Sequence, residues 1–197
     1  SGVGINALIR GEIDIANASR DMTAAERQKI HDKTGKDPVE HIVGYDALAV
    51  YVHKDNPIGE LTMGQLEAIF EKDGAITRWS QLGVTIPGGN DEIVVVGRQN
   101  SSGTYQFFNE HVLNKKDFRP EVKQMSGSKD VVELVGKTRG AIGYSGMGYK
   151  SNDVKFVKVA KAQGETAYEP SEANVVANTY PLKRSLLMYT LADPPAH

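Results

Sequence analysis

One arginine and a group of small hydrogen-bonding residues follow each other in the stretch GRQNSSGT, near the middle of the chain. Arg98 offers a planar cation that can hold two oxygens of an oxyanion. Ser102 and Thr104 add hydroxyl donors, and Gly103 removes the side chain that would keep an anion away from the backbone. The stretch lies between the apolar run EIVVV and an amphipathic run, so we expect a strand to pass into a helix here.

A helix that begins near Gly103 would add unpaired N–H groups and a partial positive charge. Together with Arg98, this arrangement suits a tetrahedral oxyanion. Charge-assisted hydrogen bonds contribute roughly 1.5–3 kcal/mol each. Several of them can therefore reach the ~8 kcal/mol of micromolar affinity without a metal ion. The alternative at this point is an ordinary helix cap beside a surface arginine.

The first residues of the chain have the features of a second half-site. The stretch SGVGINAL again places Ser and Gly at a helix start, and IDIANASRDMT places Ser19 and Arg20 directly after an expected strand. The alternatives are a flexible chain terminus for Ser1 and a turn serine for Ser19. Arg20 has two open roles, as an anion ligand or as a member of an ion pair.

The composition excludes several classes of protein. The 197 residues suffice for one large domain or two small ones, and the net charge of −2 gives no sign of a nucleic-acid-binding surface. The absence of cysteine excludes disulfides, thiolate zinc sites and cysteine nucleophiles. The five histidines lack metal-ligand spacing, so we expect no metal and no cofactor. No apolar run approaches the ~18 residues that span a bilayer, and no signal peptide is visible.

Hydrophobic periodicity and capping signals predict alternating helices and strands. Two capping boxes, Thr23 with Glu26 and Thr62 with Gln65, mark helix starts. We expect helices at 2–10, 23–32, 62–71, 103–114 and 129–136. We expect strands at 12–19, 45–54, 92–98, 140–145, 154–160 and 184–191. This alternation predicts an α/β fold with largely parallel sheets, which bind ligands beyond the carboxyl ends of their strands.

Two long apolar segments, GYDALAVYVHKDNP and YPLKRSLLMYTL, flank a central block. We interpret them as two hinge strands that join two lobes. Residues 1–47 and 180–197 would then form lobe I, and residues 48–179 would form lobe II.

At these residues the chain resembles the substrate-binding proteins of phosphate ABC transporters, within the type II periplasmic-binding-protein superfamily. The similarity runs along nearly the whole chain. Four motifs in the family's order carry it: SGVGINALIRGEIDIANASRDMT, LTMGQLEAIFEKDGAITRWSQLG, VVVGRQNSSGTYQFF and RGAIGYSGMGY. The resemblance implies a two-lobed fold with a mixed sheet in each lobe, and phosphate held in a cleft between the lobes by hydrogen bonds and one arginine.

Carried over by motif, the resemblance implies seven phosphate ligands. Lobe I would contribute Ser1 and Ser19, and lobe II would contribute Arg98, Asn100, Ser102, Gly103 and Thr104. Well-known members of the family carry aspartate where this chain has Asn100, so strict rejection of sulfate is less secure here. Family members also have a strand and a helix before the first motif and further helix after the last one. We therefore expect lobe I to be truncated at both ends, either in a fragment or in a chain completed by a second chain.

The resulting hypothesis is an extracytoplasmic solute-binding protein that captures inorganic phosphate for the membrane permease of an ABC transporter and catalyses no reaction. Within this class, sulfate or a phosphonate is an alternative solute. A sensing or signalling module and a phosphatase that uses the same anion site are the alternatives from other classes. The absence of a base near NSSGT argues against the phosphatase.

Overall fold

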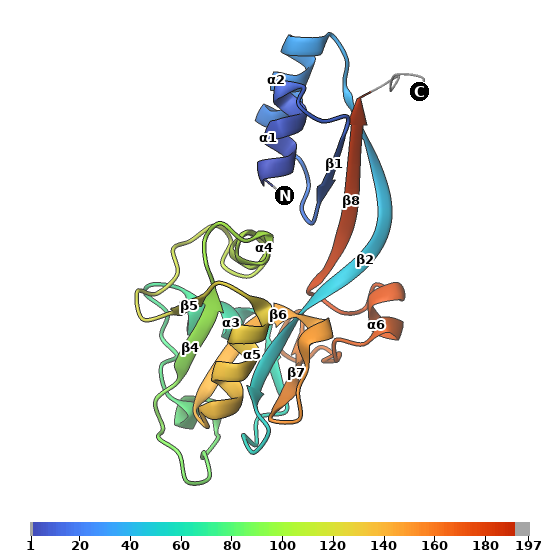
Figure 1. The fold of residues 1–197 in the computed structure, drawn as a ribbon. Helices are drawn as coiled ribbons and strands as arrows, with labels where there is room; N and C mark the ends of the chain where they lie inside the picture. Colours follow the sequence, from blue (N-terminus) through green and yellow to red (C-terminus); the bar gives the residue numbers. More distant parts are fainter. Residues whose placement is uncertain (1, 192–197) are drawn as a thin grey trace. The chain divides into compact units, whose positions relative to one another are not determined.

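The computed structural model describes residues 2–191, and the chain divides into two compact units. Unit 1 consists of Ser1–Asp46 and Arg184–His197, and unit 2 consists of Ala47–Lys183. Strand β2 (Pro38–His53) crosses from unit 1 into unit 2, and β8 (Lys183–Leu191) begins at the second boundary (Figure 1). The chain therefore passes between the units twice, each time within or beside a long strand.

In unit 1, two helices pack on three strands. The helices are α1 (Gly2–Arg10) and α2 (Ala24–Thr34), and the strands follow the order β1 (Ile15–Ala18), β8 and β2. Strand β1 is antiparallel to β8, with Ala16 opposite Tyr189. Apolar side chains of both helices, β1 and β8 form a common core: Ile5, Leu8, Ala16, Ala18, Met22, Ile30, Leu187 and Tyr189. Burial of this core holds the helices on one face of the sheet.

In unit 2, six strands form a mixed arrangement. They are the second part of β2, β3 (Glu60–Thr62), β4 (Val94–Arg98), β5 (Lys123–Met125), β6 (Ala141–Gly146) and β7 (Val154–Ala160). The order β2-β6-β4-β5 continues on the other side of β2 through β7 to β3. Strand β4 is parallel to both β5 and β6, whereas β2 is antiparallel to both β6 and β7.

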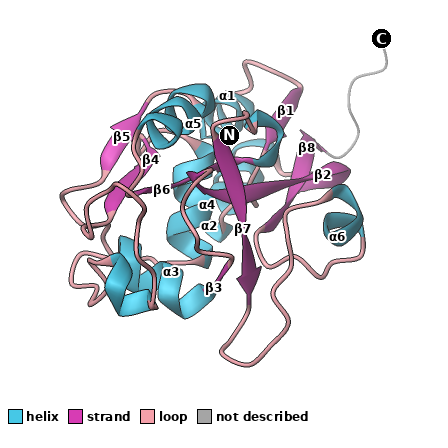
Figure 2. Cartoon of the chain, turned by 90° about the horizontal axis from the view of Figure 1, so that it is seen from below, coloured by secondary structure: helices cyan, strands magenta, loops and turns pink. Residues whose placement is uncertain are grey.

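The helices of unit 2 are α3 (Met63–Phe70), α4 (Gly103–His111), α5 (Ser128–Lys137) and the short α6 (Glu172–Val176), as Figure 2 shows by colour. Helix α5 packs on β4 and β6 through an apolar face that contains Val131, Val132 and Val135. The larger core of this unit includes Trp79, which is fully buried and donates its indole N–H to the carbonyl of Gly140 at 3.0 Å.

Most of the predicted elements are present, with shifted ends. Both capping boxes form: the Thr23 hydroxyl accepts from the Glu26 N–H at 3.2 Å, and the Thr62 hydroxyl accepts from the Gln65 N–H at 3.1 Å. The prediction of largely parallel sheets was wrong, because every strand pair that includes β1, β2 or β8 in the recorded registers is antiparallel. The mixed sheet that the resemblance implied is the observed arrangement.

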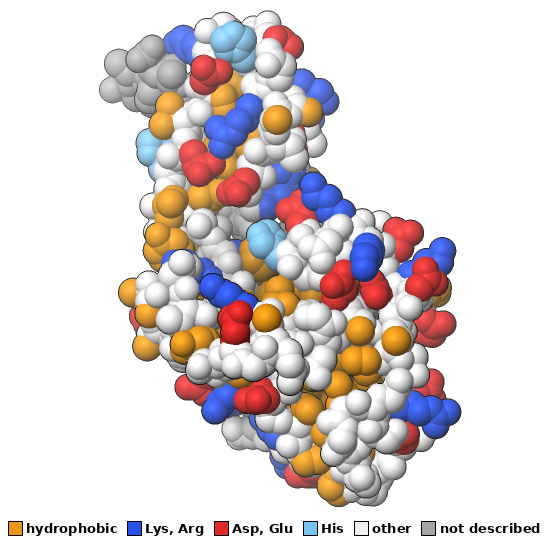
Figure 3. Space-filling model, turned by 180° about the vertical axis from the view of Figure 1, so that it is seen from behind, with side chains coloured by type: hydrophobic (Ala, Val, Ile, Leu, Met, Phe, Trp, Pro, Cys, Tyr) orange, Lys and Arg blue, Asp and Glu red, His pale blue; other side chains and the backbone are white. Residues whose placement is uncertain are grey.

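Among residues 2–191, no helix is long and apolar enough to span a bilayer. On the face that Figure 3 shows, basic and acidic side chains are interspersed rather than collected by sign. This distribution agrees with the net charge of −2.

Candidate functional site

The candidate site in unit 2 begins where strand β4 ends. Strand β4 is buried through Val95, Val96 and Gly97 and ends at the half-buried Arg98. The chain then turns, and the turn is closed by the Ser102 N–H, which donates to the carbonyl of Gln99 at 3.0 Å. Helix α4 starts at Gly103, as the sequence predicted for this strand-to-helix passage.

Ser102 caps helix α4. Its backbone is extended, with φ −84° and ψ 140°, and its hydroxyl oxygen accepts from the Tyr105 N–H at 3.0 Å. The hydroxyl hydrogen can still be donated, because an N-cap serine uses only its oxygen as an acceptor. Gly103 is the first residue of the helix, where the N–H has no intrahelical partner, and the Thr104 side chain is buried beside it. The helix start thus combines a backbone N–H that has no intrahelical partner with polar side chains.

Arg98 is held by neutral acceptors. Its Nη1 donates to the Ser128 hydroxyl at 2.8 Å, and its Nη2 donates to the carbonyl of Ser126 at 3.0 Å. Within residues 2–191, no ion pair includes Arg98, and its Nε is buried without a hydrogen-bond partner. No carboxylate therefore compensates the guanidinium charge directly.

The turn that holds Arg98 lies at the same edge of the sheet as helix α4. Strands β4 and β5 are parallel, with Arg98 opposite Met125, so both strands end at this edge. Helix α5 begins three residues after β5, at Ser128. The Asp130 carboxylate fixes the turn, because it accepts from the Gly127 N–H at 2.9 Å and from the Ser126 hydroxyl at 3.1 Å. Two helix starts and one arginine thus meet at one edge, an arrangement that favours anions.

Aromatic side chains pack against strand β4. The rings of Phe108 and Tyr144 stack with centroids 3.8 Å apart, which fixes α4 against β6. A Cβ at Gly97 would lie 3.0 Å from Val122 Cγ1 and 3.1 Å from Tyr144 Cε1, so a larger residue would require these side chains to shift by a few tenths of an ångström. Burial raises the pKa of the Tyr144 hydroxyl far above its usual range, so this group stays neutral. The stacked rings of Phe108 and Tyr144, which pack beside the strand that carries Arg98, are therefore uncharged.

Asn100 lies in the turn between β4 and α4, where it is exposed. Its side chain makes no hydrogen bond to any residue of the described part of the chain. The position where the resemblance puts an aspartate is therefore neutral and does not contact Arg98.

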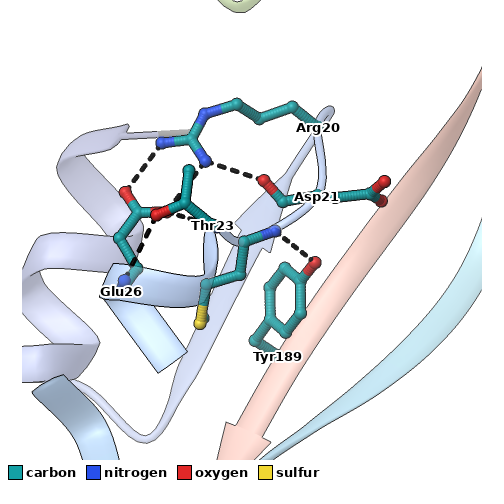
Figure 4. Close-up of polar contacts among 6 residues, drawn as sticks. Arg20, Asp21, Thr23, Glu26 and Tyr189 are labelled. Carbon is teal, nitrogen blue, oxygen red and sulfur yellow. Dashed lines mark hydrogen bonds and ion pairs between the residues drawn. The ribbon is translucent and has the colours of Figure 1, made fainter. Parts of the chain in front are cut away.

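In unit 1, Ser19 follows strand β1 in a bend and is half-buried. Its neighbour Arg20 forms an ion pair with Glu26: Nη2 lies 2.9 Å from Oε1, and Nη1 donates to Oε2 at 3.0 Å (Figure 4). Arg20 Nη1 also donates to the carbonyl of Asp21 at 2.7 Å. Of the two roles left open for Arg20, the structure shows the ion pair.

The hydrogen bond from Arg20 is the largest cause that holds the pKa of Glu26 at about 2. The same carboxylate accepts from the Thr23 N–H at 2.8 Å, and the Met22 N–H donates to the Tyr189 hydroxyl at 2.9 Å. Figure 4 shows these contacts gathered around the loop that follows Ser19. The loop is thus fixed to α2 and to β8. Ser1, the other predicted ligand of this unit, lies outside the described residues.

The sequence reasoning missed Ser126 and Ser128. The signal was present in the stretch MSGSKD, which places small polar residues before a helix as NSSGT does. The sequence predicts no strand before this stretch, because β5 has only three residues, KQM, with no apolar pattern.

Unit 2 thus presents an anion-favouring edge on a mixed α/β sheet. A family model described as PBP superfamily domain matches residues 1–196, and the chain belongs to this family. The prediction of a periplasmic-binding-protein-like fold with mixed sheets is thereby confirmed, as is the resemblance to phosphate-binding proteins.

Several relatives are named for phosphate. The phosphate-binding protein PstS of Pseudomonas aeruginosa PAO1 is 41% identical over 194 residues, which cover 95% of this chain and 60% of the relative. PstS of Staphylococcus aureus USA300 is 33% identical over 193 residues, with 96% and 57% covered. The chain thus spans about 60% of the length of these curated relatives.

Solved structures are similar along the whole chain. An ABC-type phosphate transport receptor from Vibrio cholerae has a TM-score of 0.80 and 29% identity, and the match covers 99% of this chain and 74% of that one. A phosphate ABC transporter substrate-binding protein with bound phosphate, from Clostridium perfringens, has a TM-score of 0.75 and 32% identity, with 96% and 71% covered.

Proposed function

We propose that this chain captures inorganic phosphate as the solute-binding component of an ABC transporter and makes or breaks no covalent bond. The observation that carries the proposal is the state of Arg98: a half-buried guanidinium that is held by neutral acceptors at the start of helix α4 and has no ion-pair partner within residues 2–191. The names of the relatives support phosphate and transport over a sensing role.

The proposed contacts in unit 2 follow from the chemistry of each group. Arg98 supplies the cation, Gly103 its backbone N–H, and Ser102 and Thr104 donate through their hydroxyls. Each charge-assisted bond contributes roughly 1.5–3 kcal/mol, so four such groups supply roughly 6–12 kcal/mol before the costs of ordering and desolvation. Asn100 is a neutral fifth group in the same turn.

Ser1 and Ser19 stay predicted ligands, supported by the resemblance of their motif. The interpretation of the two units as the two lobes of a binding protein is likewise part of the proposal. The ion pair of Arg20 with Glu26 supports a fixed position for the Ser19 loop, because it ties that loop to helix α2.

Asn100 bears on the choice between phosphate and sulfate. An aspartate would accept the proton of hydrogen phosphate and repel fully ionised sulfate, whereas asparagine carries no charge. We propose that phosphate is the solute and that sulfate competes with it measurably. The variant Asn100→Asp is expected to reduce the competition by sulfate.

The partners and the location are proposed on the same basis. The partner for transport would be a membrane permease, and the location would be extracytoplasmic. A second chain that completes unit 1 is supported by the apolar side chains on the helix-free face of its sheet, where Ile15, Val43 and Tyr45 are 52%, 60% and 48% exposed. Exposed apolar side chains that gather on one face are a common mark of an interaction site.

Titration calorimetry with phosphate on the full chain and on Arg98→Ala tests the proposal. The variant is expected to lose at least ~2 kcal/mol, about 30-fold in affinity, because a desolvated anion loses its cation. Arg78→Ala is the matched control, since Arg78 is 67% exposed in the same unit. Unchanged affinity in Arg98→Ala would remove Arg98 from the site, and turnover of a phosphomonoester would overturn a function by binding alone.

A further inference from the structure

Within residues 2–191, the Arg98 guanidinium donates two hydrogen bonds. One goes to Ser126 in the turn between β5 and α5, and the other goes to Ser128, the first residue of α5. We propose that Ser128 is a positioning residue, whose hydroxyl sets the orientation in which Arg98 meets an oxyanion. This inference rests on the proposed function of Arg98 as the cation of the site. It assigns to Ser128 a specific part in binding that requires no contact with the solute.

The geometry of the contact is that of a two-point clamp. Ser128 Oγ accepts from Nη1 at 2.8 Å, and the Ser126 carbonyl accepts from Nη2 at 3.0 Å. A guanidinium has five N–H groups in one plane, so two acceptors fix the plane and leave the second hydrogen of each terminal nitrogen available. Loss of one acceptor leaves a single bond, about which the group can rotate.

Ser128 holds its own position without help from Arg98. It is the first residue of α5, and that helix is anchored to β4 and β6 by its buried valines. The preceding turn is fixed by Asp130, which accepts from the Gly127 N–H and the Ser126 hydroxyl. The acceptor is therefore part of a rigid frame, while the arginine is a long side chain that must be ordered to bind.

The clamp also explains how Arg98 can be ordered while its charge stays available. In a carboxylate pair, the negative partner would offset the guanidinium charge and compete with the anion. A hydroxyl and a carbonyl orient the group through dipoles and leave its formal charge uncompensated. Ordering of the side chain before binding removes part of the entropy cost that an anion would otherwise have to offset.

The test uses three variants of the full chain, titrated with inorganic phosphate. Ser128→Ala removes the acceptor and is expected to weaken binding about fivefold to tenfold, the effect of one hydrogen bond. Ser128→Thr keeps the hydroxyl and is expected to bind within about twofold of the wild type. Ser151→Ala is the matched control, because it removes an exposed serine hydroxyl of the same unit that accepts from the Asp153 N–H instead of from Arg98.

A second readout needs no ligand. In proton–nitrogen NMR, the terminal N–H groups of Arg98 are expected to give separate signals in the wild type and in Ser151→Ala, since rotation is hindered. Averaged signals are expected in Ser128→Ala. Wild-type affinity together with unaveraged Arg98 signals in Ser128→Ala would overturn the role of Ser128 and leave the proposed function intact. If the wild type does not bind phosphate, the proposed function fails, and the NMR result alone still decides whether Ser128 orients Arg98.

Discussion

The ion pair between Arg20 and Glu26 makes unit 1 sensitive to acid, and Glu26→Gln should remove that sensitivity. Both side chains are largely buried, with 11% and 17% of their surfaces exposed, and two hydrogen bonds of 2.9 and 3.0 Å join them. The carboxylate also accepts from the Thr23 N–H. The substitution keeps the size of the side chain and removes its charge.

The magnitude follows from the pKa of Glu26, which falls from its usual 4.5 to about 2. At about 1.4 kcal/mol per pH unit, this corresponds to roughly 3 kcal/mol as an upper limit, and partial exposure reduces it to about 2 kcal/mol. Because the pKa is lowered on folding, the contribution is fully present above the unfolded value of 4.5 and is lost as the pH falls toward 2. Less than about half of it remains at pH ~3.

Hydrogen exchange with mass spectrometry, on peptides that contain Met22 and Thr23, measures the local effect. At pH ~7, Glu26→Gln is expected to lower the free energy of opening of this loop by about 2 kcal/mol. Glu12→Gln is the control, because the Arg10–Glu12 pair has similar distances but both side chains are 55% exposed, so no change is expected. An equal effect of the two substitutions, or an effect of Glu26→Gln that persists unchanged at pH ~3, would refute the reasoning.

Two further predictions concern the packing of unit 2. Gly97→Ala is expected to destabilise the chain by about 1–3 kcal/mol in calorimetric unfolding, because the new Cβ would lie 3.0 Å from Val122 and 3.1 Å from Tyr144. Unchanged stability would mean that these two side chains move aside without cost. Trp79→Phe is expected to cost about 1–3 kcal/mol in urea unfolding followed by circular dichroism, because it leaves a small cavity and removes the indole hydrogen bond to the Gly140 carbonyl, which keeps the bond from the Val94 N–H. A loss below about 1 kcal/mol would show that the surrounding core closes over the cavity.

The sequence predicted the strand-to-helix passage at Arg98 because the signal there is local. An apolar run enters a polar turn, and Ser102 caps a helix that starts at Gly103. Local signals also placed the capping boxes at Thr23 and Thr62, which form as expected. Such features depend on residues three or four positions apart, and the periodicity of the sequence records them directly.

The elements that the sequence did not predict depend on distant pairing. Strand β5 has three residues and exists because β4 pairs with it, and the acceptors for Arg98 follow from that pairing. Strand β2 begins at Pro38 instead of Tyr45, because its exposed first part pairs with β8, more than a hundred residues further along the chain. No pattern within the segments 38–44 or 123–125 specifies those partners.

A crystal structure of the full chain grown with phosphate tests the central claim most directly. The account predicts a tetrahedral anion within hydrogen-bond distance of the Arg98 guanidinium and the Gly103 backbone N–H, with the contact between Arg98 and Ser128 retained. Phosphate bound elsewhere while this edge of the sheet holds no anion, or the edge filled by the protein's own side chains, would contradict it.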